Sequence, residues 1–135
     1  MSKGKDVEKI AFPSSKNGGF DDTCSLIFEK CRTFTILKLV NGKVENVEVV
    51  RNPKHETGDC LESISLLNKK GVDSIVVGGM GRIAFRVCND LGISILCGLR
   101  TVKVRTSLKT YLRGEFSPLT AKAVYNSILE KWSMW

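Results

Sequence analysis

The stretch SIVVGGMGRIAF, residues 74–85, joins an apolar run to an amphipathic segment through three glycines. The run VDSIVV at 72–77 is typical of a strand buried in a parallel sheet. The segment from Gly81 to Leu91 has apolar residues at helical spacing and ends at Gly92. A buried strand that passes directly into a helix predicts a βαβ unit, and ISILC at 93–97 supplies its next strand.

Three strands are predicted upstream of this unit. VEKIAF at 7–12 predicts a short strand that ends at Pro13. TFTILKLV at 33–40 and KVENVEVVRN at 43–52 flank Asn41-Gly42, which is the strongest short hairpin signal. The sequence therefore predicts a single strand followed by an antiparallel hairpin.

Two amphipathic helices flank the strand at 72–77. CLESISLLNKK at 60–70 has apolar residues at helical spacing and Gly71 as its stop. The helix over 81–91 is expected to turn one apolar face to the core. That face consists of Ile83, Ala84, Val87, Cys88 and Leu91.

Two further helices are predicted after the last strand. Thr101 is expected to cap a helix that runs through Leu112. Ser117-Pro118 is typical of an N-cap followed by proline and predicts a helix from there to residue 135. This tail has one broad apolar face, and we expect Trp132 and Trp135 to bury against the domain or a second subunit.

The order of these elements predicts the fold class. It is β-β-β-α-β-α-β-α-α, which indicates an α/β fold with a hairpin unit followed by right-handed crossovers. We expect a mixed five-stranded sheet with helices on its faces. A chain of 135 residues is expected to form one domain, 1–135.

The composition restricts the class of protein. Lys and Arg number 21 against 14 Asp and Glu, and the net charge of +7 favours anionic partners or merely keeps the chain in solution. No window approaches the roughly 20 apolar residues of a membrane span, and no export signal is seen, so we expect a cytoplasmic protein. Five cysteines, an odd number without a C-x-x-C pair, indicate neither a disulfide framework nor a zinc knuckle.

Several segments, in order and at matching spacing, resemble the dinitrogenase iron–molybdenum cofactor biosynthesis family. They are KIAFP, 25–34, NGKVENVEVVRNP, KKGVDSIVVGGMGRIAF, LGISI and TVKVRTSLKTYLRGE, so that the resemblance covers about 9–116 and leaves 117–135 as an extension. It implies a ribonuclease H-like fold with strand order 3-2-1-4-5 and an antiparallel second strand. It also implies small carriers or accessory proteins, some of which bind anionic metal–sulfur clusters.

One segment departs from the family pattern. The family often has Ser-x-His-Phe-Gly-Arg before the second strand, and this chain has Ser25-Leu26-Ile27-Phe28-Glu29-Lys30. Ile27 therefore stands where the resemblance implies a cofactor-binding histidine. Glu29 and Lys30 stand at the glycine and arginine positions.

The implied topology gathers candidate metal ligands at one edge of the sheet. Ligands of open α/β sheets bind beyond the carboxyl ends of the strands, where the connections 13–31, 52–60, 78–81 and 97–101 would meet. Thiolates and imidazole are ligands for soft metals and metal–sulfur clusters. The candidates are Cys24, Cys31, His55, Cys60 and Cys97. Cys88 lies within a helix and is expected in the core.

The same edge offers candidate groups for an anion. Helix N-termini at the glycine loop and at Thr101 are expected to leave N–H groups unpaired. The candidates for cofactor binding are Gly78, Gly79, Gly81, Arg82, Lys30 and Arg100. No Gly-Lys-Ser/Thr follows, so this is not a P-loop, and the acidic residue of a dinucleotide fold is absent. A tight strand-to-helix turn and a ligand dock remain open alternatives.

Enzymatic activity is not predicted. A ribonuclease H-like nuclease needs a metal-binding carboxylate in the first strand, and Ile10-Ala11-Phe12 has none. We expect a non-enzymatic carrier of an anionic ligand, with an iron–sulfur or molybdenum-containing cluster as the implied cofactor. A protein that receives the cluster and a homodimer are the expected partners. The alternative is a basic nucleic-acid-binding module without nuclease activity.

Overall fold

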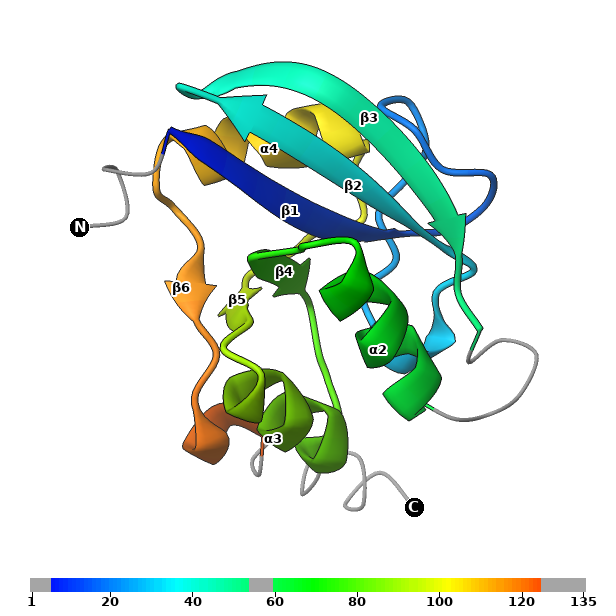
Figure 1. Ribbon diagram of the computed structural model, residues 1–135, viewed down its shortest axis with the longest axis vertical. Helices are drawn as coiled ribbons and strands as arrows, with labels where there is room; N and C mark the ends of the chain where they lie inside the picture. The colour runs from blue at the N-terminus through cyan, green and yellow to red at the C-terminus, as the bar shows by residue number, and fades with distance from the viewer. Residues whose placement is uncertain (1–5, 54–59, 125–135) are drawn as a thin grey trace.

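The computed structural model describes residues 6–53 and 60–124, which form a mixed sheet with helices on both faces (Figure 1). The strands lie in the order β3-β2-β1-β4-β5-β6. Their bounds are β1 (Val7–Ser14), β2 (Thr33–Val40), β3 (Lys43–Arg51), β4 (Ser74–Val77), β5 (Ser94–Cys97) and β6 (Ser117–Pro118). The helices are the 3₁₀ turn η2 (Phe28–Lys30), α2 (Cys60–Lys69), α3 (Arg82–Asp90) and α4 (Val104–Leu112).

The predicted order of the first five strands is confirmed. β1 pairs antiparallel with β2 and parallel with β4, and β4 pairs parallel with β5. β2 and β3 form the predicted hairpin. Asn41 and Gly42 both have positive φ, 52° and 80°, as the tight turn between such strands requires. The ribonuclease H-like description stays a prediction.

The sheet has six strands, so the prediction of five is wrong. Ser117–Pro118 forms β6 and pairs antiparallel with β5, where a helix start was expected. Proline is tolerated there because β6 is an edge strand, whose outer N–H groups need no partner. The helix begins after Thr120, whose Oγ1 accepts a hydrogen bond from the Ala123 N–H at 3.1 Å. The predicted positions of Trp132 and Trp135 lie outside the described residues.

Two other predicted boundaries are wrong. β1 continues through Pro13 to Ser14, and the Pro13 carbonyl accepts the Ser25 N–H at 2.9 Å. α4 begins at Val104 with Lys103 as its N-cap residue, not at Thr101. In both places, residues from the 13–31 loop supply the contacts, which local sequence patterns do not reveal.

The hydrophobic core has two parts, one on each face of the sheet. Successive residues of a strand point to opposite faces, so that neighbours such as Ile10 and Ala11 enter different clusters. One cluster lies under α2 and α3. It includes Ala11, Phe34, Ile36, Ile64, Leu67, Ile75, Val77, Ala84 and Cys88. The other lies under α4 and includes Ile10, Phe12, Leu37, Leu39, Val76, Val104 and Leu108.

The buried face of α3 is narrower than the apolar face predicted for the helix over 81–91. Ala84 and Cys88 of α3 are buried, which confirms the core position of Cys88. Ile83 is 68% exposed and Leu91 is 45% exposed, so the prediction that they face the core is wrong. Among the described residues, no helix has the length and apolar character needed to cross a membrane.

Candidate functional site

The segment 26–30 lies directly beside the glycine loop 78–81. The Gly78 and Gly79 N–H groups both donate to the Leu26 carbonyl, at 2.8 and 2.9 Å. The Phe28 N–H donates to the Gly79 carbonyl at 3.1 Å, and Ile27 and Gly79 form a parallel bridge. The two segments therefore run side by side, like a short continuation of the sheet.

Gly78 is needed because of this close approach. A Cβ atom at this position would lie 2.9 Å from the Leu26 Cβ and 3.0 Å from the Leu26 carbonyl oxygen. Backbone cannot move aside as a side-chain end can, so no larger residue fits without a shift. The tight turn with close backbone approach, one of the two alternatives, thus has a direct cause within the chain itself.

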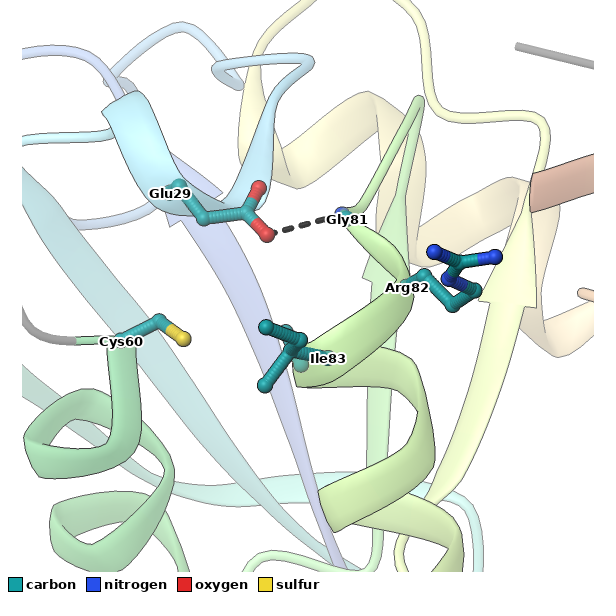
Figure 2. Close-up of a pocket in the computed structure, with 6 residues that line it drawn as sticks. Glu29, Cys60, Gly81, Arg82 and Ile83 are labelled. Atoms are coloured by element: carbon teal, nitrogen blue, oxygen red, sulfur yellow. Dashed lines mark hydrogen bonds between the residues drawn. The ribbon is translucent and has the colours of Figure 1, made fainter. Parts of the chain in front are cut away.

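Glu29 occupies the start of α3 (Figure 2). Its Oε2 accepts a hydrogen bond from the Gly81 N–H at 2.8 Å. Gly81 is the N-cap residue of α3 and has no side chain with which to cap the helix. A carboxylate stabilises a helix N-terminus by charge and by hydrogen bonding. Glu29 therefore satisfies the Gly81 N–H from within the chain.

The first backbone N–H groups of α4 also have hydrogen-bond partners within the chain. The Val104 N–H donates to the Asp22 carbonyl at 3.0 Å, and the Arg105 N–H donates to the Phe20 carbonyl at 2.9 Å. These contacts contradict the expectation of unpaired amides at the start of α4, and at the start of α3 the Gly81 N–H is paired with Glu29. The assignment of Gly78, Gly79 and Gly81 to ligand binding stays a prediction.

An open pocket of about 310 Å³ lies between η2, α2 and α3. Its lining residues are Glu29, Cys60, Gly81, Arg82, Ile83 and Ala84. Figure 2 shows the Cys60 thiol turned toward Ile83, with the Arg82 side chain on the other side of the helix start. Three of the four connections expected at this edge therefore contribute to one pocket.

Lys30, Arg82 and Arg100 lie around the glycine loop on three different segments. Lys30 follows Glu29 and Arg82 follows Gly81, so both flank the same hydrogen bond. The Leu99 N–H donates to the Val77 carbonyl at 3.2 Å, which places Arg100 beside the end of β4. All three are exposed, and none forms an ion pair with a carboxylate in the described part of the chain.

The predicted metal ligands do not come together as a set. Cys24 and Cys31 are each 1% exposed and belong to the two opposite core clusters. The Cys24 Sγ lies 3.3 Å from the Ser107 Oγ, and the Cys31 Sγ donates to the Phe28 carbonyl at 3.3 Å. Burial raises the pKa of the Cys24 thiol, and it raises the pKa of Cys31 to about 12. Both side chains therefore stay neutral thiols inside the core.

Cys60 and Cys97 are half-buried, but only Cys60 lines the pocket. Cys97 ends β5, with its Sγ 4.0 Å from the Pro118 carbonyl. His55 lies outside the described residues. Over 6–53 and 60–124, no three His, Cys, Asp or Glu side chains lie close enough to hold a metal ion.

Glu29 is the site residue that sequence reasoning missed. It was noticed only as a departure from the family pattern, at the position where the pattern has glycine. Its partner Gly81 is 52 residues away in sequence. Because only the folded chain brings the two together, no local sequence signal marks Glu29 as the partner of Gly81.

The comparisons with known proteins confirm the resemblance. An uncharacterized protein of Methanocaldococcus jannaschii is 32% identical over 111 residues, or 79% of this chain and 87% of that protein. The apo form of the orange protein from Desulfovibrio gigas has a TM-score of 0.71 at 21% identity, covering 84% of this chain and 97% of that one. A NifB-like protein from Thermotoga has a TM-score of 0.71 at 23% identity, with coverages of 84% and 95%.

These two structural neighbours share the fold. The sequence pattern of the family described as dinitrogenase iron-molybdenum cofactor matches residues 8–114, a range that includes all strands from β2 to β5 and the helices from η2 to α4. Because that match extends over most of the chain, the protein belongs to the dinitrogenase iron-molybdenum cofactor family.

Proposed function

We propose that the protein is a non-enzymatic carrier or accessory protein that holds an anionic cargo at the glycine-loop edge. The cargo class that the family supports is a metal–sulfur cluster or its precursor. The observation that carries the proposal is the set of three exposed cations, Lys30, Arg82 and Arg100, around residues 78–81. Cations without intramolecular ion pairs keep their full attraction for an external anion.

Side chains rather than backbone amides would bind the cargo. The amides of Gly78, Gly79 and Gly81 are already hydrogen-bonded within the chain. Lysine and arginine side chains are long enough to close on an anion from different segments. Cys60 fits the cargo because its half-buried thiol lies in the same pocket, and thiolate is a preferred ligand of iron and other soft metals.

The first strand lacks the carboxylate that nuclease chemistry would need. Ile10, Ala11 and Phe12 in the middle of β1 are fully buried and apolar. A carboxylate at that position would be needed for two-metal phosphodiester chemistry. We therefore propose cargo holding rather than nuclease activity, and the ribonuclease H-like description carries no activity with it.

The metal content of the native protein tests the proposal. The protein is purified without oxygen from its own host, and its iron, molybdenum and sulfide are measured together with its visible absorption spectrum. We expect a stoichiometric metal–sulfur species. Metal-free protein from cells that make such clusters, together with no spectral change on anaerobic addition of tetrathiomolybdate or of iron and sulfide, would refute the carrier function.

A matched pair of triple variants tests the cation set. One variant replaces Lys30, Arg82 and Arg100 by alanine, and the control replaces Lys43, Lys69 and Lys109, exposed cations elsewhere on the chain. Exposed ion pairs are worth about 0.5 kcal/mol each, so the loss of three should cost about 1.5 kcal/mol, and we expect roughly tenfold weaker tetrathiomolybdate binding in the first variant only. Equal losses in both variants would show that net charge alone acts.

The nucleic-acid alternative is tested with the same two variants. A salt-dependent electrophoretic shift with RNA or DNA that the first variant loses would favour it over the carrier, because phosphate contacts give steep salt slopes.

A further inference from the structure

We propose that the glycine-loop edge is also a docking surface for an acidic protein. The docking edge is defined by three exposed apolar residues, Leu26, Ile27 and Ile83, and by two exposed cations, Lys30 and Arg86. The partner fitting it has an apolar centre bordered by carboxylates. The inference goes beyond cargo binding because it can be tested on metal-free protein.

The apolar part of the docking edge follows from how 26–29 packs. Its backbone lies against the glycine loop, which leaves Leu26 38% exposed and Ile27 36% exposed. The Ile27 Cδ1 would be 3.2 Å from a Cβ at position 79, so its side chain covers the loop. Ile83, 68% exposed, lines the adjoining pocket with Glu29 (Figure 2). The Glu29–Gly81 hydrogen bond joins the segment that carries Ile27 to the helix start that carries Ile83, and clustered exposed apolar residues mark contact surfaces more than single ones do.

The cations lie next to these apolar side chains. Lys30 follows Glu29 in η2, at the margin of the pocket. Arg86 is three residues after Ile83 and four after Arg82, so that it neighbours both on the surface of α3. Neither Lys30 nor Arg86 forms an ion pair with a described carboxylate. Glu29, the one carboxylate that lines the pocket, already accepts the Gly81 N–H.

Charge selects the acidic partner over a second copy of this chain. A two-fold interface would bring Lys30 and Arg86 of one copy toward the same residues of the other, on molecules that each carry a net charge of +7. Facing like charges disfavour such a contact, whereas a border of carboxylates would pair with them.

The chemistry of the apolar residues selects a protein over nucleic acid. Proteins that bind single strands stack bases on aromatic side chains. The large apolar side chains exposed in the described part of the chain are Val7, Leu26, Ile27, Val49, Leu61, Ile83, Leu91 and Leu112, and all are aliphatic. Aliphatic side chains fit into the apolar pockets of a protein partner.

Photo-crosslinking identifies the occupant. A benzoylphenylalanine replaces Ile83 in one sample and Leu112, a 50% exposed residue of α4, in the control. Each metal-free protein is illuminated in an anaerobic extract of the host. We expect an adduct with one acidic protein from position 83 and not from position 112. No adduct at 83 above the control, or an adduct only with a second copy or with RNA, would overturn the proposal.

Binding between purified proteins completes the test. The crosslinked protein is expressed and titrated with wild type, with Ile83→Ser/Arg86→Glu, and with the control Leu112→Ser/Lys109→Glu, which has the same spacing on α4. We expect at least tenfold weaker binding for the first variant, less than twofold for the control, and weaker binding at higher salt. Equal affinities for the two variants would refute the docking edge.

Two controls keep the result separate from cargo binding. Both double variants should melt at the wild-type temperature, since all four residues are exposed. Ile83 lines the pocket with Cys60, and Arg86 neighbours Arg82. A third variant, Ile27→Ser, is therefore added at a 36% exposed residue outside the lining of that pocket. Loss of partner binding with unchanged tetrathiomolybdate binding in Ile27→Ser therefore supports docking alone, and the reverse supports the carrier alone.

Discussion

At the scale of single residues, Gly78 and Glu29 determine how the glycine loop is used. Gly78 allows the loop to approach the Leu26 backbone, and Glu29 closes the start of α3. Both contacts join segments about 50 residues apart, so each needs the folded chain. Together they hold 26–30 and 78–81 as one unit, to which the pocket and the cations belong.

Alanine at position 78 should destabilise the protein more than alanine at position 79. The new Cβ would meet the Leu26 backbone at position 78, but only the end of the Ile27 side chain at position 79. We expect the free energy of unfolding to fall by about 1–3 kcal/mol for Gly78→Ala and by less than about 1 kcal/mol for Gly79→Ala. Urea unfolding measures both, and equal losses would contradict the close-approach argument.

Alkaline pH should destabilise the protein through its buried thiols. Burial raises the pKa of Cys31 and that of Cys88 from 9.0 to about 12 each. Between these values the folded state keeps protons that the unfolded state has lost. Stability is therefore fully present below pH 9.0 and falls as pH rises toward about 12, by up to about 1.4 kcal/mol per pH unit and thiol.

Cysteine variants test this pH dependence. Urea unfolding at several alkaline pH values should give a shallower loss of stability for Cys31→Ala than for wild type. Val77→Ala, which removes buried methyl groups and no titratable group, is the control and should keep the wild-type slope. An unchanged slope in Cys31→Ala would show that the pKa of the Cys31 thiol is the same in the folded and the unfolded state.

Single residues also show what sequence reasoning could reach. Cys88 was assigned to the core because its helical period was clear, and Asn41-Gly42 to a turn because φ is positive at few residue types. The role of Glu29 was out of reach, because its partner is 52 residues away. The exposure of Ile83 could not be predicted for a different reason. The helical period shows which residues share a face of the helix, but not how much of that face the rest of the protein covers.

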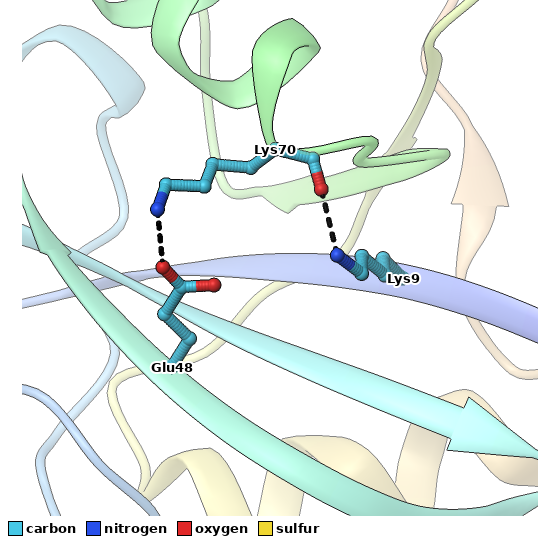
Figure 3. A network of polar contacts seen from close by, with 3 residues as sticks. All are labelled: Lys9, Glu48 and Lys70. Atoms are coloured by element: carbon cyan, nitrogen blue, oxygen red, sulfur yellow. Dashed lines mark hydrogen bonds and ion pairs between the residues drawn. The ribbon is translucent and has the colours of Figure 1, made fainter.

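At the scale of elements, polar contacts attach the end of α2 to the sheet (Figure 3). The Lys9 ammonium of β1 donates to the Lys70 carbonyl at 2.9 Å, and the Lys70 ammonium lies 2.5 Å from the Glu48 carboxylate of β3. The Asp73 carboxylate accepts a hydrogen bond from the Lys9 backbone N–H at 2.9 Å. A cation at a helix C-terminus is favourable, so Lys9 fixes the turn from α2 into β4.

Removing the Lys9 ammonium should loosen this turn. Lys9→Met keeps most of the aliphatic stem but leaves the Lys70 carbonyl without its donor. We expect a loss of about 0.5–1.5 kcal/mol in the free energy of unfolding. Lys43→Met, an exposed cation at the start of β3 and away from helix ends, is the control and should stay within about 0.5 kcal/mol of wild type. Equal effects would mean that the loss reflects net charge.

Helices and strands whose sequence has a clear hydrophobic period were predicted, and those without such a period were not. β2, β3, α2 and β4 lie within a few residues of their predicted bounds, because alternation and helical spacing extend over most of each element. β6 has two residues and no period of its own. β6 forms because β5 offers it hydrogen-bonding groups. Ser117-Pro118 has the local pattern of a helix start, but pairing with β5 overrides that preference.

At the scale of the whole molecule, one sheet separates two cores and brings its loops to one end. α2 and α3 cover one face, and α4 covers the other. The segments after β1, β4 and β5 meet beyond the ends of their strands, as the parallel topology predicts. The topology thus predicted where these loops would meet, whereas the hydrogen bond from Gly81 to Glu29 depends on contacts that topology does not specify.

Removal of 117–135 should expose both an edge and an apolar surface. The deletion takes away β6, the hydrogen bond from the Leu119 N–H to the Ile95 carbonyl, and the Val124 side chain, which is 1% exposed. We expect a loss of about 2–4 kcal/mol and a tendency to associate through β5. Thermal melting and light scattering measure both.

A shorter deletion separates the two parts of the tail. Removal of 125–135 keeps β6 and Val124, so any loss it causes belongs to the terminal segment with Trp132 and Trp135. If the longer deletion keeps the melting temperature and the mass in solution of the full chain, the whole tail is dispensable.

Under the proposed function, the hydrogen bond between Glu29 and Gly81 would make the edge selective by the size of the anion. A small anion that approached the Gly81 N–H would compete with a carboxylate tethered beside it, at an effective concentration of roughly millimolar or more. A polyvalent anion wide enough to reach Lys30, Arg82 and Arg100 together would need no amide, so under the proposed function the internal carboxylate would disfavour small anions and leave large ones to the three cations.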